Sequence, residues 1–124
     1  MSVLLDTHIL LWWFKDDREL SRSAQKIITD TNDVYVSAAT AWEIAIKREL
    51  KKLRFTADLE REIEANGFTS LDITVTHALA AGGLPRHHDD PFDRMLVAQA
   101  ISENLKLLTH DKALLRYGNF VIVA

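Results

Sequence analysis

The sequence predicts an α/β protein, built as a three-layer α/β/α sandwich around a central parallel sheet of about five strands. Short apolar runs alternate along the chain with longer stretches of helical periodicity, which is the order expected of strand-helix-strand units. No hairpin signal, internal repeat or low-complexity segment interrupts this alternation. Because each strand is followed by a helical crossover, we expect the strands to be parallel and the sheet to be covered on both faces.

The composition limits the class of protein. The chain has 124 residues, of which 48% are hydrophobic, so we expect residues 1–124 to form a single domain with one core. The absence of cysteine excludes disulfides, thiolate zinc sites and a cysteine nucleophile, and is compatible with a reducing cytoplasm. The N-terminus lacks a basic leader and the apolar run 9–14 is too short to cross a bilayer, so we expect no membrane association. A net charge of −3 excludes a protein that coats nucleic acid through bulk charge.

The first predicted strand is the apolar run Val3–Leu5, whose lack of alternation is typical of a strand buried on both faces. It ends at Asp6, which should therefore lie at the carboxyl end of the strand. A helix is predicted over Ile9–Phe14. A second helix is predicted over Arg22–Thr31, with Ser21 as its N-cap.

The middle of the chain repeats this order. Val34–Val36 is the second predicted strand, and Ser37 is the predicted N-cap of a helix over Ala38–Ile46. Glu43 is a lone carboxylate in that helix, which otherwise has little polar surface. An amphipathic, acid-rich helix is then predicted over Thr56–Ala65.

The next stretch leads to a helix that begins with two acids. A third strand is predicted at Leu71–Ile73 and a helix of small residues at Thr76–Ala81. Asp90 can then act as an N-cap, with Pro91 at the first helical position, where its missing N–H costs nothing. Asp93, in the first turn, shares a face with apolar side chains that should pack inward.

The end of the chain returns to the pattern of its beginning. A fourth strand is predicted at Leu105–Leu108, a short helix near Lys112–Arg116 and a last strand at Phe120–Ile122. Asp111 follows the fourth strand as Asp6 follows the first. In a parallel sheet such strand ends lie at one edge, where ligands bind.

Four acidic side chains are predicted to converge at this edge: Asp6, Glu43, Asp93 and Asp111. Unpaired carboxylates would repel one another there and lose solvation, and a hard divalent cation would relieve both costs. Mg²⁺ and Mn²⁺ favour oxygen ligands, and Mg²⁺ keeps several waters. Such an ion can lower the pKa of a water and generate a nucleophile for phosphodiester hydrolysis. The acids therefore predict a hydrolytic site that uses Mg²⁺ or Mn²⁺.

Each acid also has a structural explanation, which the sequence leaves open. Asp6, Asp90 and Asp111 can be simple N-caps. Glu43 can form a helical ion pair with Lys47, four residues later. Residues that can cap an element or hydrogen-bond an acid or a coordinated water are Thr7, Ser37, Thr109 and Asp90.

A local basic patch follows the helix that carries Glu43. The candidate contacts to RNA phosphates are Lys47, Arg48, Lys51, Lys52 and, beside the acids, Arg94. The patch can equally be a solvated helix end. His87 and His88 are interpreted as solvated loop residues, with contact to a substrate phosphate as the alternative.

In their order and local sequence these residues resemble PIN-domain ribonucleases, especially the toxin subunits of bacterial type II toxin–antitoxin systems of the VapC kind. The similarity runs through residues 4–8, 36–47, 90–100 and 108–111 and thus covers nearly the whole domain. The resemblance implies a PIN-like fold and assigns the family's acids to Asp6, Glu43, Asp93 and Asp111, with Asp93 rather than Asp90 as the third acid. It further implies an Mg²⁺- or Mn²⁺-dependent endoribonuclease, usually dimeric and silenced by a cognate antitoxin that blocks the site.

Two other classes of function are alternatives. A receiver-like signalling module also binds Mg²⁺ at the end of a parallel sheet, but it needs paired acids after the first strand and a lysine near the last. Here Asp6 has no acidic neighbour and no lysine follows Lys112. A noncatalytic partner-binding protein would use Trp12, Trp13 and the segment 47–54 as its interface.

Overall fold

The computed structural model describes residues 1–124 and places five parallel strands in one sheet, in the spatial order β3-β2-β1-β4-β5. The strands are β1 (Ser2–Leu5), β2 (Asp33–Ser37), β3 (Thr69–Leu71), β4 (Lys106–Thr109) and β5 (Val121–Val123). The helices are α1 (Thr7–Lys15), α2 (Arg22–Asp30), α3 (Ala38–Glu49), α4 (Leu59–Ala65), α5 (Val75–Gly82), α6 (Pro91–Glu103) and the 3₁₀ helix η1 (Lys112–Tyr117). The predicted parallel sheet is confirmed.

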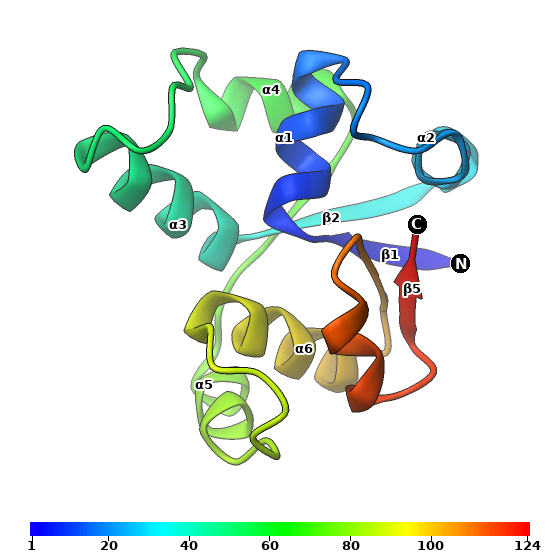
Figure 1. The fold of residues 1–124 in the computed structure, drawn as a ribbon, viewed down its shortest axis with the longest axis vertical. Helices are drawn as coiled ribbons and strands as arrows, with labels where there is room; N and C mark the ends of the chain where they lie inside the picture. The colour runs from blue at the N-terminus through cyan, green and yellow to red at the C-terminus, as the bar shows by residue number, and fades with distance from the viewer.

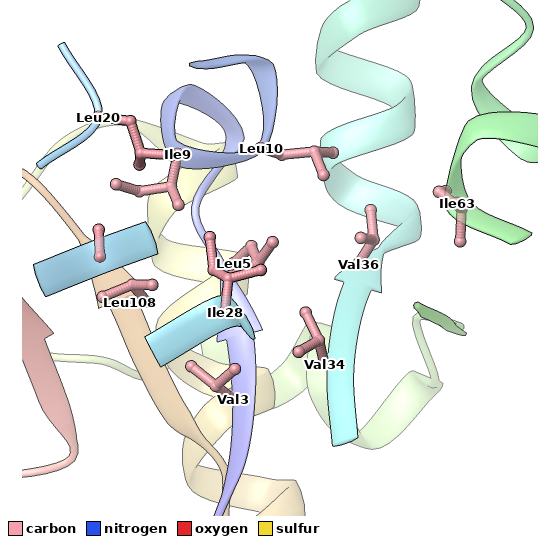
Figure 2. Packing of buried hydrophobic residues seen from close by; sticks show 11 residues of the cluster. Val3, Leu5, Ile9, Leu10, Leu20, Ile28, Val34, Val36, Ile63 and Leu108 are labelled. Atoms are coloured by element: carbon pink, nitrogen blue, oxygen red, sulfur yellow. The ribbon is translucent and has the colours of Figure 1, made fainter. Parts of the chain in front are cut away.

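Helices cover both faces of the sheet, as the three-layer prediction requires. Helices α1, α2 and α4 lie on one side, and α5, α6 and η1 lie on the other (Figure 1). Val3 and Leu5 of β1 pack in the first core with Ile28 of α2 (Figure 2). Leu4 packs in the second core with Leu96 of α6. Strand β1 is apolar from Val3 to Leu5 because both of its faces are buried there.

The register of the central strands places Asp6 and Asp111 at one edge of the sheet. Leu4 lies opposite Tyr35 of β2 and Leu107 of β4. The ladder between β1 and β4 ends where the backbone N–H of Asp6 donates to the carbonyl of Leu108 at 2.9 Å. The carboxyl ends of β1 and β4 therefore lie side by side.

Strand β3 lies earlier in the sequence than predicted. It spans Thr69–Leu71 rather than Leu71–Ile73, and its first two residues, which are exposed, pair with Tyr35 and Val36 of β2. Because β3 is an edge strand that pairs only with β2, it needs few buried side chains. The apolar content of the sequence therefore pointed to the wrong residues.

Helices α4 and α3 differ most from their predicted bounds. Helix α4 begins at Leu59 rather than at Thr56, because the side chain of Asp58 caps it. Helix α3 continues to Glu49, past the predicted end at Ile46, so the start of the basic patch belongs to the helix that carries the buried acid. None of the helices is long and apolar enough to cross a bilayer.

Candidate metal centre

Asp6 is held by hydrogen bonds to both of its carboxylate oxygens. It directly follows β1 and is only 3% exposed. Its Oδ1 accepts the backbone N–H of His8 at 2.8 Å and so caps α1. Its Oδ2 accepts the hydroxyl of Thr109 at 2.8 Å, and that hydroxyl oxygen accepts the backbone N–H of Asp111 at 3.0 Å. The cap therefore fixes the carboxylate at the sheet edge, and each oxygen keeps lone pairs for a further ligand.

Glu43 forms the predicted ion pair with Lys47, but its carboxylate is buried rather than at the surface. Its side chain is 5% exposed, and its Oε2 accepts the Lys47 ammonium at 2.6 Å. Its Oε1 is buried without a hydrogen-bond partner, and it is the only side-chain nitrogen or oxygen of the chain in that situation. The hydrogen bond with Glu43 raises the pKa of Lys47, and the charges of Asp90 and Asp93 raise it further. Helix α3 therefore brings Lys47, the ion-pair partner of Glu43, within electrostatic reach of the start of α6.

Asp90 performs the capping role predicted for it. Its Oδ1 accepts the backbone N–H groups of Phe92 at 2.8 Å and of Asp93 at 3.2 Å. The ring of Phe92 lies edge-on to Trp42 of α3, with ring centroids 5.6 Å apart. The first turn of α6 is thus fixed both by its cap and by contact with α3.

Asp93 is a carboxyl group in an unfavourable place for its charge. Its side chain is 20% exposed. Burial raises the pKa of Asp93 to about 7, the negative charges of Asp6 and Asp90 raise it too, and the hydrogen bond with His88 opposes them. The contribution of Asp6 couples this carboxyl group electrostatically to the acid at the end of β1. Without a cation, this carboxyl is largely protonated below neutral pH.

Asp111 joins the same group through His88. Its Oδ1 accepts the backbone N–H of Ala113 at 2.9 Å and caps η1, while its Oδ2 lies 3.7 Å from Nε2 of His88. The same Nε2 lies 2.8 Å from Oδ2 of Asp93. The ligand atoms of His88, Asp93 and Asp111 all lie within 4.8 Å of one another. His88 is half-buried, so its interpretation as a solvated loop residue is wrong.

These side chains fit a hard divalent cation. The donors are carboxylates and an imidazole, and the chain contains no thiolate. The unpartnered Oε1 of Glu43 and the raised pKa of Asp93 are both costs that a cation would remove. Oxygen-rich donor sets of this kind suit Mg²⁺ and Mn²⁺.

Two of the predicted supporting residues do not contact an acid. The hydroxyl of Thr7 lies 3.0 Å from that of Thr40. The hydroxyl of Ser37 caps α3 and donates to Oε1 of Gln99 at 2.5 Å. Both are buried, so they brace the helices that carry the acids rather than the acids themselves.

The basic patch lies beside the acids on α3 and the turn that follows it. Arg48, Lys51 and Lys52 are exposed and form no ion pair. A pocket of about 190 Å³ lies between α1 and this patch. It is lined by Thr7, His8, Leu11, Trp12, Lys15, Asp17, Ile44, Lys47, Lys52 and Leu53.

Arg94 has a structural role that was not predicted. Its guanidinium donates to the carbonyls of Ala81 at 2.9 Å, Leu84 at 3.2 Å, Pro85 at 3.2 Å and His88 at 3.4 Å. With its donors directed at backbone carbonyls, this side chain holds the loop between α5 and α6. Its expected contact with RNA is therefore not supported by its place in the fold.

Sequence reasoning missed Gln99 and His88. Gln99 is fully buried, accepts the hydroxyl of Ser37 and donates to the carbonyl of Asp72 at 3.2 Å. A signal for it existed, because it is the one polar residue in the apolar run 96–100. His88 had no such signal, because a loop residue belongs to no periodic pattern.

Comparison with known proteins identifies the family. The PIN domain family matches residues 3–119. Ribonuclease VapC22 from Mycobacterium tuberculosis (strain ATCC 25618 / H37Rv) is 29% identical over 116 residues, which are 91% of this chain and 89% of that protein. A toxin-antitoxin complex from Klebsiella pneumoniae contains a chain that superposes with a TM-score of 0.72 at 19% identity, covering 98% of this chain and 97% of that chain. A chain of VapBC2 from Rickettsia felis, bound to a DNA fragment from their promoter, superposes with a TM-score of 0.67 at 16% identity, covering 100% and 98%. The fold and the extent of the family match together show that this chain belongs to the PIN domain family.

Proposed function

We propose that this PIN-domain protein is a metal-dependent endoribonuclease that acts as the toxin of a type II toxin–antitoxin pair. Its family and its similarity to a protein named a ribonuclease support the activity. Its likeness to chains of toxin-antitoxin complexes supports the biological role. The observation that carries the proposal is the group formed by Asp93, Asp111 and His88, whose ligand atoms lie within 4.8 Å of one another. Asp6 lies at the neighbouring strand end, and the buried Oε1 of Glu43 has no hydrogen-bond partner. The receiver-like alternative has no comparable support.

The roles of the site residues follow from their positions. The Mg²⁺ or Mn²⁺ ion or ions would be held by Asp6, Glu43, Asp93 and Asp111. A divalent cation supplies a water of lowered pKa and offsets charge on the phosphate as its bond to oxygen breaks. Thr109 fixes the orientation of Asp6 through its hydroxyl, and Asp90 fixes the start of α6. These contacts hold the ligands in place before the ion and the RNA arrive.

The exposed basic patch is the proposed path of the RNA backbone. Lys47 carries positive charge beside the acids, and Arg48, Lys51 and Lys52 extend it along the surface. Each lysine or arginine that neutralises a phosphate releases counterions, so RNA binding should weaken as salt is raised. Arg94 is not part of this proposal.

The toxin role includes a cognate antitoxin that covers the acidic edge, a homodimeric state and a cytoplasmic location. Trp42 of α3, which contacts Phe92 in the first turn of α6, is 64% exposed and offers an apolar contact to a protein partner. If a small DNA-binding protein is encoded in the neighbouring reading frame, adding it should suppress cleavage. Light scattering of the protein alone would measure the oligomeric state.

The activity can be tested with protein purified free of any antitoxin. Total RNA is incubated with Mg²⁺, Mn²⁺ or EDTA, and the products are resolved by gel and by end mapping. Asp6→Asn and Glu43→Gln should abolish the cleavage that wild type shows with a cation. Asp16→Asn is the matched control, because Asp16 is an exposed cap with a φ of 51° that asparagine adopts readily.

Two results would contradict the proposal. Equal cleavage by all of these proteins would identify a contaminating nuclease. No cleavage by folded wild type with either cation would remove the ribonuclease activity itself.

A further inference from the structure

His88 lies in the loop between α5 and α6, where it faces two of the acids. Its Nε2 is 2.8 Å from Oδ2 of Asp93 and 3.7 Å from Oδ2 of Asp111. The exposed fractions of these three side chains are similar, at 22%, 20% and 32%. The three groups thus come from a loop, a helix start and the end of β4, and they meet at the border between the protein and solvent.

The loop that carries His88 is fixed independently of any ion. Arg94 donates to the backbone carbonyl of His88 and to those of Leu84 and Pro85. The hydroxyl of Tyr117 donates to the carbonyl of Pro85 at 3.0 Å. These bonds hold the imidazole over the acids, so little conformational entropy would be lost if it bound a ligand there.

We propose that His88 is a nitrogen ligand of the divalent cation, shared with Asp93 and Asp111. The proposal rests on the proposed function, which supplies the cation, and adds an imidazole to a site otherwise made of carboxylates. Two ligands of one octahedral ion, each at ~2.1 Å, lie roughly 3 Å apart when adjacent and roughly 4.2 Å apart when opposite. The separations of 2.8 Å and 3.7 Å from Nε2 fall close to that range.

The proposal has a consequence for the identity of the ion. Mg²⁺ is a hard cation that prefers oxygen, whereas imidazole binds transition metals well. A site with His88 as a ligand should therefore favour Mn²⁺ over Mg²⁺. In His88→Gln an amide oxygen takes the place of the nitrogen, so this preference should shrink.

A second imidazole cluster in the chain provides the internal comparison. His8 and His110 lie beside Asp6, and the ligand atoms of these three residues lie within 4.8 Å of one another. However, the rings of His8 and His110 pack against each other in a T-shaped arrangement, with ring centroids 5.3 Å apart, and His110 packs in the same way on Trp12 with ring centroids 4.8 Å apart. Nδ1 of His8 is also 3.9 Å from Oδ1 of Asp6, farther than His88 is from its nearest acid.

The test uses the magnetic properties of Mn²⁺ rather than catalysis. Metal-free protein is titrated with Mn²⁺ and free ion is followed by electron paramagnetic resonance, with Mg²⁺ added as a competitor. Electron spin echo modulation of the bound ion then reports whether a nitrogen nucleus is coordinated. The proteins compared are wild type, His88→Gln, His88→Ala, His8→Gln, His110→Gln and, as the exposed neighbour, His87→Gln.

We expect nitrogen coupling in every protein except the two His88 variants. Their Mn²⁺ affinity should fall about 10-fold or more, with a smaller change for Mg²⁺ in His88→Gln. Wild type labelled with ¹⁵N-histidine should show coupling of Mn²⁺ to ¹⁵N in place of ¹⁴N. This experiment tests histidine ligation in the unsubstituted protein, so a folding defect of a variant cannot affect it.

Three results would overturn the proposal: no nitrogen coupling in wild type, coupling that persists without His88, or coupling that is lost only with His8 or His110. RNA cleavage, measured separately, distinguishes this failure from that of the proposed function. Cleavage without nitrogen coupling removes only the role of His88. Coupling without cleavage removes only the ribonuclease activity.

Discussion

Helix α6 contacts two polar clusters that the fold treats in opposite ways. At its start, Asp93 meets His88 and Asp111 at the border with solvent, and burial raises the pKa of Asp93 to about 7. In its middle, Gln99 accepts the hydroxyl of Ser37, and both side chains are at most 1% exposed. The two clusters lie on one helix and connect it to neighbouring elements.

The difference between the clusters lies in whether the protein satisfies its own polar groups. Both ends of the Gln99 amide have partners: Ser37 on one side, and the carbonyl of Asp72 on the other. The cluster at the helix start has more negative charge than the chain neutralises, and it is open to solvent. A satisfied, neutral cluster stabilises the fold, whereas an unbalanced one is suited to a ligand. Substitutions in the first should therefore change stability, and substitutions in the second should change activity.

The largest expected effect is the loss of activity in Asp93→Asn. Asparagine keeps the shape of the side chain but removes its charge, so the proposed site loses a ligand. RNA cleavage should fall by at least about 100-fold, since even residues that only orient a ligand are typically worth ~10–100-fold. The rate is measured with end-labelled RNA at saturating Mn²⁺, and the melting temperature in EDTA serves as the control. A variant that retains cleavage would show that the helix start is not part of the site.

The next largest effect is a decrease in the stability of the metal-free protein as pH rises. A carboxyl whose pKa rises on folding, here from 3.8 to about 7, binds its proton more tightly in the folded state. Protonation of Asp93 therefore stabilises the folded state fully below about pH 4. This stabilisation decreases as pH rises from about 4 to about 7 and does not change further above about pH 7. Compared with Asp93→Asn in EDTA, wild type should lose a few kcal/mol between about pH 5 and about pH 8.

Urea denaturation at several pH values measures this difference. The same comparison in a His88→Gln background shows how much of the difference depends on the contact between Asp93 and His88. The quantity compared is the free energy of unfolding of wild type minus that of Asp93→Asn. If it does not change with pH, or if it increases as pH rises, the buried and crowded position of Asp93 is contradicted.

The sheet edge was predictable because strands and helices leave periodic patterns. The apolar run before Asp6 and the recurrence of the same pattern before Asp111 placed both acids at strand ends, and the register of β1 with β4 puts those ends side by side. The cap and proline at 90 and 91 predicted the start of α6, which the structure has at Pro91. In each case the local preference, for a buried strand or for a helix cap, requires the same residue type as the tertiary fold.

The details of the site were not predictable in that way. Arg94 was assigned to RNA because it is a cation beside acids, yet its donors are used by carbonyls of a loop whose path no periodicity encodes. The bridging position of His88 depends on that same loop. Edge strand β3 was misplaced for a related reason, since an exposed edge places few demands on side-chain type. Sequence patterns report what is buried in regular elements, and much of this site lies outside them.

The third prediction tests the satisfied cluster. In Gln99→Leu the hydroxyl of Ser37 loses its acceptor in a fully buried place, which should lower the free energy of unfolding by about 1–3 kcal/mol. Cleavage by the folded fraction should stay within about threefold of wild type, because no reacting group is removed. Gln25→Leu is the matched control, since Gln25 makes only a 3.4 Å bond to the carbonyl of Leu20. Loss of activity without loss of stability would place Gln99 in the catalytic machinery and remove the contrast between the clusters.

The smallest effect should come from Asp90→Ala, which separates the cap from the acid three residues later. Asp90 accepts two backbone N–H groups of α6, so its removal should lower the free energy of unfolding by about 1 kcal/mol. Asp58→Ala, which removes the aspartate cap of α4, a helix that carries none of the four acids, should cost a similar amount or less because its bond is 3.3 Å long. Cleavage should fall only a few-fold in Asp90→Ala and not at all in Asp58→Ala. If Asp90→Ala instead abolished cleavage while the fold kept its stability, Asp90 would belong among the metal ligands. The unbalanced charge at the start of α6 would then involve both of its acids.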